Sequence, residues 1–298
     1  MMKCIIPEEL IDNNFIHMNK NAEQYINKNI DKINMDSLCR NKNTLHLINK
    51  NNLDYTFLSM NTNKDAIGLW DINKINWIWA SANKSASHLY NDNIEKLEWY
   101  MVSINTGAIE FIKEHLDKID WDGLSLNKNA IDILEQNKDK INWSNLSENK
   151  NAIKLLEQNI SKIDWERLSC NENAIHLIKE NMDKINWKNL STNKNAIEIL
   201  KNNINKISWI DLCSNKNAME IILNNLDKIK ELKINLSFLS ENPSIFVYDY
   251  EKMKKNMHIH LEELMKKVYH PKRFEYMLYK YNYDICDDNY MFYNIEYK

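Results

Sequence analysis

The sequence predicts an all-α solenoid of about 11 short helix-pair repeats with a 22-residue period and a helical C-terminal cap. Tryptophan recurs at every 22nd position, at Trp77, Trp99, Trp121, Trp143, Trp165, Trp187 and Trp209. A small residue recurs with the same period at Ala108, Ala130, Ala152, Ala174, Ala196 and Ala218. A fixed period of this kind is typical of one supersecondary unit stacked many times. We therefore expect one continuous body without a central core.

One clear copy of the unit, INWSNLSENKNAIKLLEQNISK, illustrates the expected local fold. Asn142 is placed to cap a helix of one to two turns over Trp143–Ser147, because an asparagine side chain accepts from the first amides of a helix. Asn149–Asn151 forms a polar corner. Ala152–Leu156 then has the apolar spacing of a second short helix, which ends near Asn159, a residue type that tolerates the left-handed conformation.

Helices of this length are marginal alone, because nucleation is costly and few hydrogen bonds follow it. Their stability must come from stacking one unit on the next. We therefore assign the recurrent tryptophans to the structural core of the array, where the small alanines let neighbouring helices approach closely.

The period changes at two places. Met35 to Tyr55 and Ala66 to Ala86 are each 20 residues apart, which predicts a local bend between residues 51 and 73. Near the end, Leu212 and Leu239 are 27 residues apart, and Pro243 begins the following segment. Proline suits a first helical position in a terminal repeat.

These features predict three regions along the chain: an N-terminal cap over residues 1–14, a repeat array over residues 15–248 and a helical C-terminal cap and tail over residues 249–298. Arrays need capping segments because their terminal units otherwise expose an apolar face. We expect cap helices at His260–Tyr269 and Pro271–Tyr281. The array itself is expected to form an extended superhelix.

The repeated Ile-Asn-Trp-x-x-Leu-Ser-x-Asn-x-Asn-Ala-Ile motif, the closing segment Leu239–Phe246 and the segment Glu262–Phe274 resemble the Asn-rich repeat proteins encoded by giant DNA viruses of the mimivirus kind. The resemblance covers nearly the whole chain, and its motifs are packing motifs. It implies a viral origin and an all-helical repeat fold. The family has no established activity, so the resemblance implies no reaction.

Composition favours an intracellular protein without a membrane-spanning segment. The chain has a formal net charge of −3, and Met1–Lys20 lacks the basic-then-apolar pattern of a signal peptide. Five cysteines form no C-x-x-C pair, and an odd number fits a disulfide framework poorly. Cys39 and Cys213 replace the serine of the Leu-Ser dipeptide, so we expect reduced, buried thiols.

The candidate interaction site follows the aromatic position of the repeat. Two residues beyond that position, later units have mostly polar residues, whereas three early units have Phe57, Trp79 and Met101; Ile78 and Tyr100 lie one residue earlier. Equivalent positions of stacked units lie in a column, and aromatic residues and Met are enriched in protein interfaces. We therefore predict an exposed patch for a viral or host protein partner, with the chain acting as a scaffold or adaptor. The alternative is that these side chains fill space around the irregular spacing.

RNA binding is the second candidate function, because some helical repeats read one base per unit. A lysine ladder recurs at Lys118, Lys140, Lys162, Lys184 and Lys206. Nearby acidic residues weaken this prediction, since nucleic-acid binding requires a net basic surface.

Enzymatic and metal sites find little support in the sequence. It has no phosphate-binding glycine loop and no nucleophile-elbow motif. His258 and His260 form an H-x-H pair near Glu262, but in a helix the two rings of such a pair point in different directions. We expect a non-enzymatic protein without cofactor or metal.

Overall fold

The computed structural model describes residues 2–34, 36–48, 51, 53–231, 237–255, 270, 272, 276 and 280. The chain divides into two compact units: the repeat body, Met2–Val247, and a C-terminal unit that runs from Tyr248 to Lys298. In the C-terminal unit, residues 250–255 are helical. The expected helices His260–Tyr269 and Pro271–Tyr281 lie almost entirely outside the described residues.

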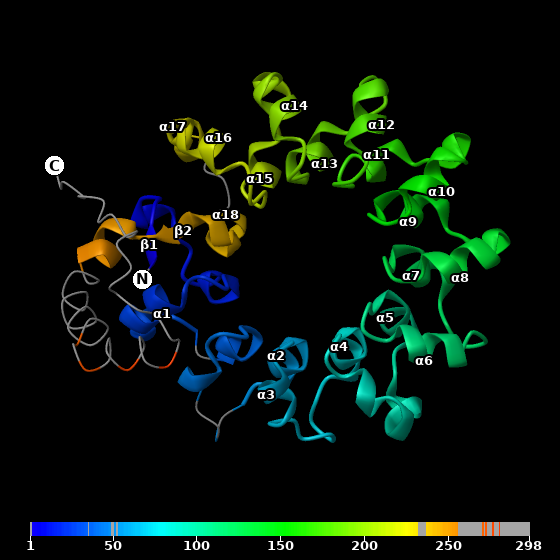
Figure 1. The fold of residues 1–298 in the computed structure, drawn as a ribbon, viewed down its shortest axis with the longest axis horizontal. Coiled ribbons are helices and arrows are strands. Elements are labelled where there is room, and N and C mark those ends of the chain that lie inside the picture. Colours follow the sequence, from blue (N-terminus) through cyan, green and yellow to red (C-terminus); the bar gives the residue numbers. More distant parts are fainter. Residues whose placement is uncertain are drawn as a thin grey trace. The chain divides into compact units, whose positions relative to one another are not determined.

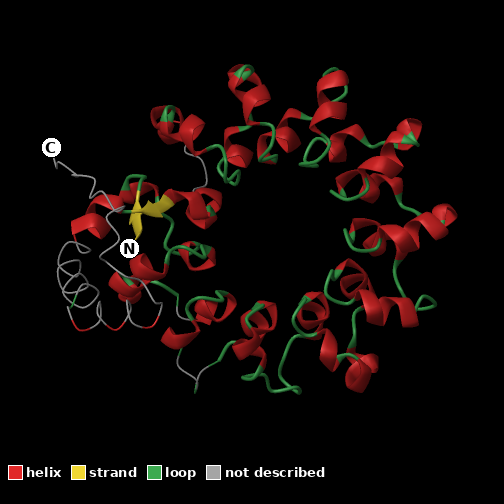
Figure 2. Cartoon of the chain, in the orientation of Figure 1, coloured by secondary structure: helices red, strands yellow, loops and turns green. Residues whose placement is uncertain are grey.

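The repeat body consists of short helices joined by turns, which confirms the predicted all-α repeat architecture (Figure 2). Each unit begins with a first helix; in chain order these are η2 (Ile16–Met18), η4 (Asp36–Arg40), α2 (Tyr55–Met60), α4 (Trp77–Ala82), α5 (Trp99–Ile104), α7 (Trp121–Leu126), α9 (Trp143–Glu148), α11 (Trp165–Leu168), α13 (Trp187–Thr192), α15 (Trp209–Leu212) and α18 (Ser237–Glu241). The second helices are α1 (Glu23–Lys28), η5 (Leu45–Leu47), α3 (Lys64–Ile67), η6 (Ser87–Leu89), α6 (Ile109–Glu114), α8 (Ile131–Gln136), α10 (Ile153–Glu157), α12 (Ile175–Glu180), α14 (Ile197–Lys201), α16 (Met219–Leu223) and η11 (Pro243–Ile245). The η elements are 3₁₀ helices.

Several units contain a third helical turn that the sequence analysis does not anticipate. These turns are η3 (Ile30–Lys32), η7 (Asn91–Lys96), η8 (Lys138–Lys140), η9 (Ile160–Lys162), η10 (Ile204–Lys206) and α17 (Leu226–Glu231). Another 3₁₀ turn, η1 (Glu8–Leu10), precedes the first unit, and the two short strands are β1 (Met2–Cys4) and β2 (Phe246–Tyr248).

Asparagine caps the start of several first helices and closes the end of several second helices, the latter by a different bond from the one expected. Asn142 caps α9 by accepting from the amide of Asn145, as predicted. Asn159, expected in the left-handed region, has φ −136°, so that prediction is wrong. Its side chain instead donates to the carbonyl of Leu155 at 2.8 Å. A side-chain amide that binds the last helical carbonyls makes a left-handed residue unnecessary.

Successive first helices pack side by side along the repeat body, and Figure 1 shows them on an inner circle with most second helices outside it. The circle closes, because α18 of the last unit packs against η2 of the first. Strand β1 pairs with β2, and the Ile5 amide donates to the Ile245 carbonyl at 2.9 Å.

The repeat body is therefore a closed ring, in place of the extended superhelix expected from the sequence. The segment expected to be an N-terminal cap contacts the last unit: the Asp12 amide donates to Ser240 Oγ at 2.6 Å. The physical reason is that each unit turns the array by a further increment, and eleven increments bring the last unit onto the first. Each terminal face then covers the other.

The core lies between the two helix layers. Recurrent leucines of the first helices and alanines at the start of the second helices are completely buried, as Leu146 and Ala152 are. The main apolar cluster runs through most of the units, whereas Cys39, Leu58 and Ala66 form a separate small cluster. That separate cluster lies where the sequence has its 20-residue spacings. Cys39 and Cys213 are both completely buried at the serine position, as expected.

Candidate interaction surfaces

A ladder of buried asparagines joins each unit to the one before it. Asn149 Nδ2 donates to the carbonyls of Ser125 and Asn127 at 2.9 and 3.1 Å, while its Oδ1 accepts from the Asn151 amide. The eleven members are Asn19, Asn41, Asn61, Asn83, Asn105, Asn127, Asn149, Asn171, Asn193, Asn215 and Asn242. Because a buried carbonyl without a partner is costly, this ladder fixes the register of the stack.

The asparagine ladder also closes the ring. Asn19 Nδ2 donates to the carbonyls of Ser240 and Asn242, at 2.9 and 2.8 Å. Asn242 in turn donates to the carbonyls of Cys213 and Asn215. The first and last units are thus joined by the same pair of bonds that joins most neighbouring units.

A second ladder runs two residues further along each turn. Asn151 Nδ2 donates to the Lys128 carbonyl at 2.8 Å, and this bond recurs in most units. Gly107 replaces the side chain in one unit, where a Cβ atom would lie 2.3 Å from the Lys84 carbonyl oxygen. The backbone between the two ladders is therefore held on both sides.

The lysine ladder considered for RNA binding lies over the tryptophan rings. Lys162 Nζ is 4.4 Å from the ring centroid of Trp143, and Lys140 Nζ is 4.5 Å from that of Trp121. Every lysine of that ladder, at the end of its unit, stands over the tryptophan that begins the same unit. Cation–π contacts at such distances contribute about 0.5–1 kcal/mol at exposed sites. These lysines thus help to hold the last turn of each unit against its first helix.

The tryptophans are mostly half-buried and pack against the main cluster, as the assignment to the structural core requires. Trp209 is buried. Each ring therefore has one face on apolar side chains and, where a lysine lies above it, the other face under an ammonium group.

The predicted apolar patch lies on the neighbouring helices α2, α4 and α5. Ile78, Trp79 and Tyr100 are 48%, 39% and 37% exposed, respectively. Phe57 and Met101 are half-buried, and Phe57 packs against the small cluster of Leu58 and Ala66. Phe57 therefore fits the alternative in which the side chain fills space near the irregular repeat spacing, whereas Trp79 and Tyr100 remain exposed.

In α9 and α13 the position equivalent to Trp79 is occupied by an asparagine that bonds to the preceding unit. Asn145 Nδ2 donates to the Asp122 carbonyl, and Asn189 Nδ2 donates to the Glu166 carbonyl, both at 2.9 Å. Gly123 ends the apolar series, and a Cβ atom there would lie 2.9 Å from the Tyr100 carbonyl oxygen, too close for a side chain to be accommodated without a shift. The patch therefore has a defined boundary along the ring.

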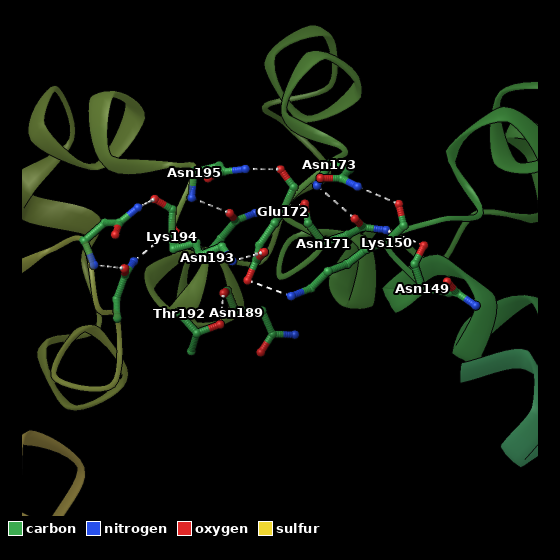
Figure 3. Close-up of polar contacts among 12 residues, drawn as sticks. Asn149, Lys150, Asn171, Glu172, Asn173, Asn189, Thr192, Asn193, Lys194 and Asn195 are labelled. Carbon is green, nitrogen blue, oxygen red and sulfur yellow. Dashed lines mark hydrogen bonds and ion pairs between the residues drawn. The ribbon is translucent and has the colours of Figure 1, made fainter. Parts of the chain in front are cut away.

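An ion-pair cluster centred on Glu172 occupies the turn between the two ladders (Figure 3). Its two carboxylate oxygens lie 2.8 Å from Lys150 Nζ and 2.6 Å from Lys194 Nζ, and its side chain is only 17% exposed. Burial alone would raise the pKa of the Glu172 carboxyl, but the hydrogen bonds from both lysines lower it overall. The two lysines occupy the same repeat position as Glu172 in the units on either side.

A cavity of about 280 Å³ lies where the ring closes. Side chains of the last unit and the first three units line it: Met18, Lys20, Arg40, Asn41, Lys42, Met60, Thr62 and Glu241. Arg40 donates to the Met18 sulfur at 3.8 Å. Burial and then the charge of Arg40 lower the pKa of His17 to about 4, whereas burial raises the pKa of Glu241 although Arg40 opposes it.

The asparagine ladder and this cavity are not predicted by the sequence. An Asn-x-Asn turn recurs in most units, but the sequence alone indicates only a polar corner there. The cavity depends on residues from both ends of the chain, which no local pattern connects.

The described residues contain no cluster suited to a metal ion and no helix suited to a bilayer. Within the described ranges, no three His, Cys, Asp or Glu side chains are grouped to hold a metal ion. His258, His260 and Glu262 lie outside those ranges. No helix in the described part of the chain has the length and apolar character needed to cross a bilayer.

Comparison with known proteins identifies no family model, no curated protein and no solved structure that matches this chain.

Proposed function

We propose that the protein is a non-enzymatic, ring-shaped scaffold that binds a protein partner through the patch of Phe57, Ile78, Trp79, Tyr100 and Met101. The observation that carries the proposal is the difference between sectors of one regular array. From α7 to α13 these positions hold polar side chains or glycine, and Asn145 and Asn189 bond to the preceding unit. In α4 and α5 both positions are apolar, and Ile78, Trp79 and Tyr100 are exposed; single exposed apolar side chains recur at Ile210 and Phe238. Exposed aromatic side chains that do not serve the stack are the usual anchors of protein interfaces.

The closed ring supports this role, because a rigid framework lowers the entropic cost of holding the anchors in place. The partner is expected to present a complementary apolar pocket. The resemblance to giant-virus repeat proteins makes a viral or host protein the proposed partner class.

A comparative pull-down tests the proposal. The double variant Ile78→Ser with Trp79→Ser removes the two most exposed anchors. The matched control is Ser144→Ala with Asn145→Ala, which changes the same two repeat positions in α9. Bound proteins are identified by mass spectrometry, and circular dichroism verifies that all forms remain folded.

We expect the wild type and the control to retain a partner that the patch variant loses. If all three forms capture the same proteins, the patch is not the binding surface. RNA binding is tested in parallel by a salt titration with single-stranded RNA, in which a steep loss of affinity with salt favours the alternative function.

A further inference from the structure

One repeat position combines a fixed backbone with a mostly basic side chain. It is the residue between the two ladder asparagines, occupied in chain order by Lys20, Lys42, Thr62, Lys84, Thr106, Lys128, Lys150, Glu172, Lys194, Lys216 and Pro243. Seven of these eleven residues are lysines in a chain whose net charge is −3. The ladders hold the backbone on both sides, so side chains from neighbouring units start from fixed points.

Glu172 shows what this arrangement does with an anionic group. Its carboxylate receives one lysine from the unit before and one from the unit after (Figure 3). Both pairs lie within hydrogen-bond distance and are partly shielded from water, conditions under which charge-assisted bonds are strongest. An anionic group is thus held between two units by lysines at this repeat position.

At the ring closure, lysines occupy the same repeat position as Lys150 and Lys194, but no carboxylate like that of Glu172 lies between them in the part of the chain that the structure describes. Lys20, Lys42 and Arg40 line the cavity, and Thr62 occupies the repeat position next to Lys42. Among the described residues, no carboxylate lies within ion-pair distance of these three cations. Glu241 is the one acidic residue that lines the cavity, so its lining has a formal charge of +2.

We propose that this cavity binds a phosphate group, either as the free anion or as the monoester of a small molecule. A phosphate monoester has a charge of about −1.5 to −2 at neutral pH, which matches the excess of cations. The guanidinium group of Arg40 provides parallel donors suited to phosphate oxygens, and the lysines act as point charges. The Thr62 hydroxyl supplies a neutral donor, and Met18 and Met60 provide apolar walls for the ester group.

Isothermal titration calorimetry at constant ionic strength tests the site. Inorganic phosphate and glycerol phosphate are the two probes, and they distinguish the free anion from the monoester. We expect saturable binding of one phosphate group per chain by at least one probe. The absence of saturable binding in the millimolar range with both probes overturns the proposal.

Two variants locate the site. Arg40→Gln removes one donor group and is expected to weaken binding roughly tenfold, the usual effect of losing one charge-assisted hydrogen bond. Thr62→Glu leaves every cation in place but supplies a carboxylate like that of Glu172, so it should abolish binding. Circular dichroism confirms that each variant folds.

The repeat provides matched controls outside the cavity. Thr106→Glu makes the same change as Thr62→Glu at the same repeat position of another unit. Lys128→Gln removes the lysine that occupies this repeat position in the unit after Thr106. Both variants are expected to bind phosphate with the affinity of the wild type. If they reduce affinity as much as Thr62→Glu and Arg40→Gln, the response reflects net charge and the assignment of the cavity is wrong.

Discussion

Replacing a single ladder asparagine gives the sharpest test of what holds the ring together. Asn149→Ala removes two donated bonds, to the carbonyls of Ser125 and Asn127, and one accepted bond from the amide of Asn151. Asn149 is 2% exposed, so water cannot readily replace these partners. Each lost bond in a buried site costs about 1 kcal/mol or more, which predicts a loss of roughly 3 kcal/mol in the free energy of unfolding.

The adjacent residue of the second ladder is a control within the same turn. Asn151 is exposed, and its side chain makes one bond to the Lys128 carbonyl at 2.8 Å. Water can satisfy that carbonyl after the change, so Asn151→Ala is expected to cost no more than about 1 kcal/mol. Urea unfolding, followed by both circular dichroism and tryptophan fluorescence, measures the two variants and reveals any departure from two-state behaviour.

A third variant separates donation from packing. Asn149→Asp keeps the shape but directs a carboxylate at two carbonyl oxygens, which raises the pKa of the new carboxyl in the folded state. Its stability should therefore increase as the pH falls, because the folded state then binds the extra proton. If Asn149→Ala costs no more than Asn151→Ala, and Asn149→Asp is insensitive to pH, the ladder does not stabilise the fold as argued.

Three further predictions concern ring closure, the Glu172 cluster and the buried thiols. Asn19→Ala removes its two bonds to the carbonyls of Ser240 and Asn242 and weakens the closure. As urea is added, small-angle X-ray scattering should therefore show the radius of gyration of this variant rising before that of Asn149→Ala; the same rise in both variants contradicts closure in solution. Hydrogen bonds hold the pKa of Glu172 below its ordinary value of 4.5 despite partial burial, so its ion pairs stabilise the fold above that pH and lose their effect as the pH falls through the folded pKa. Glu172→Gln should then lower the melting temperature at neutral pH and have little effect near about pH 3, whereas an equal effect at both pH values refutes the linkage. Burial raises the pKa of the Cys213 thiol to about 11, so a thiol reagent should label it far more slowly in the native protein than in urea, and equal rates would show an accessible thiol.

Local features of the unit could be predicted from the sequence because each depends on residues close together in the chain. Asn142 caps its helix, and the second helix of that unit begins at Ile153, one residue after the predicted start. Trp79 is exposed, as the patch hypothesis requires. Spacing alone thus locates the helices and the column of repeat-variable residues.

Ring closure could not be predicted, because it depends on the angle between successive units. A small change of that angle accumulates over eleven units and decides whether the ends meet or pass each other. The role of Asn149 was missed for a related reason: its partners lie 22 and 24 residues earlier and become neighbours only after stacking. The sequence also could not distinguish whether the periodic lysines bind RNA or pack within the chain. The structure shows Lys162 over the Trp143 ring.

Closure has a consequence for how the gene can change. An open array tolerates duplication or loss of a unit, because a new end simply replaces the old one. Here the gain or loss of one unit would move Asn19 out of hydrogen-bond distance from the carbonyls of Ser240 and Asn242. The angle between every two neighbouring units would then have to change to restore the contact. We therefore expect selection to hold the number of copies constant while substitutions accumulate within them, so that diversity arises by altering side chains around a circumference of fixed length.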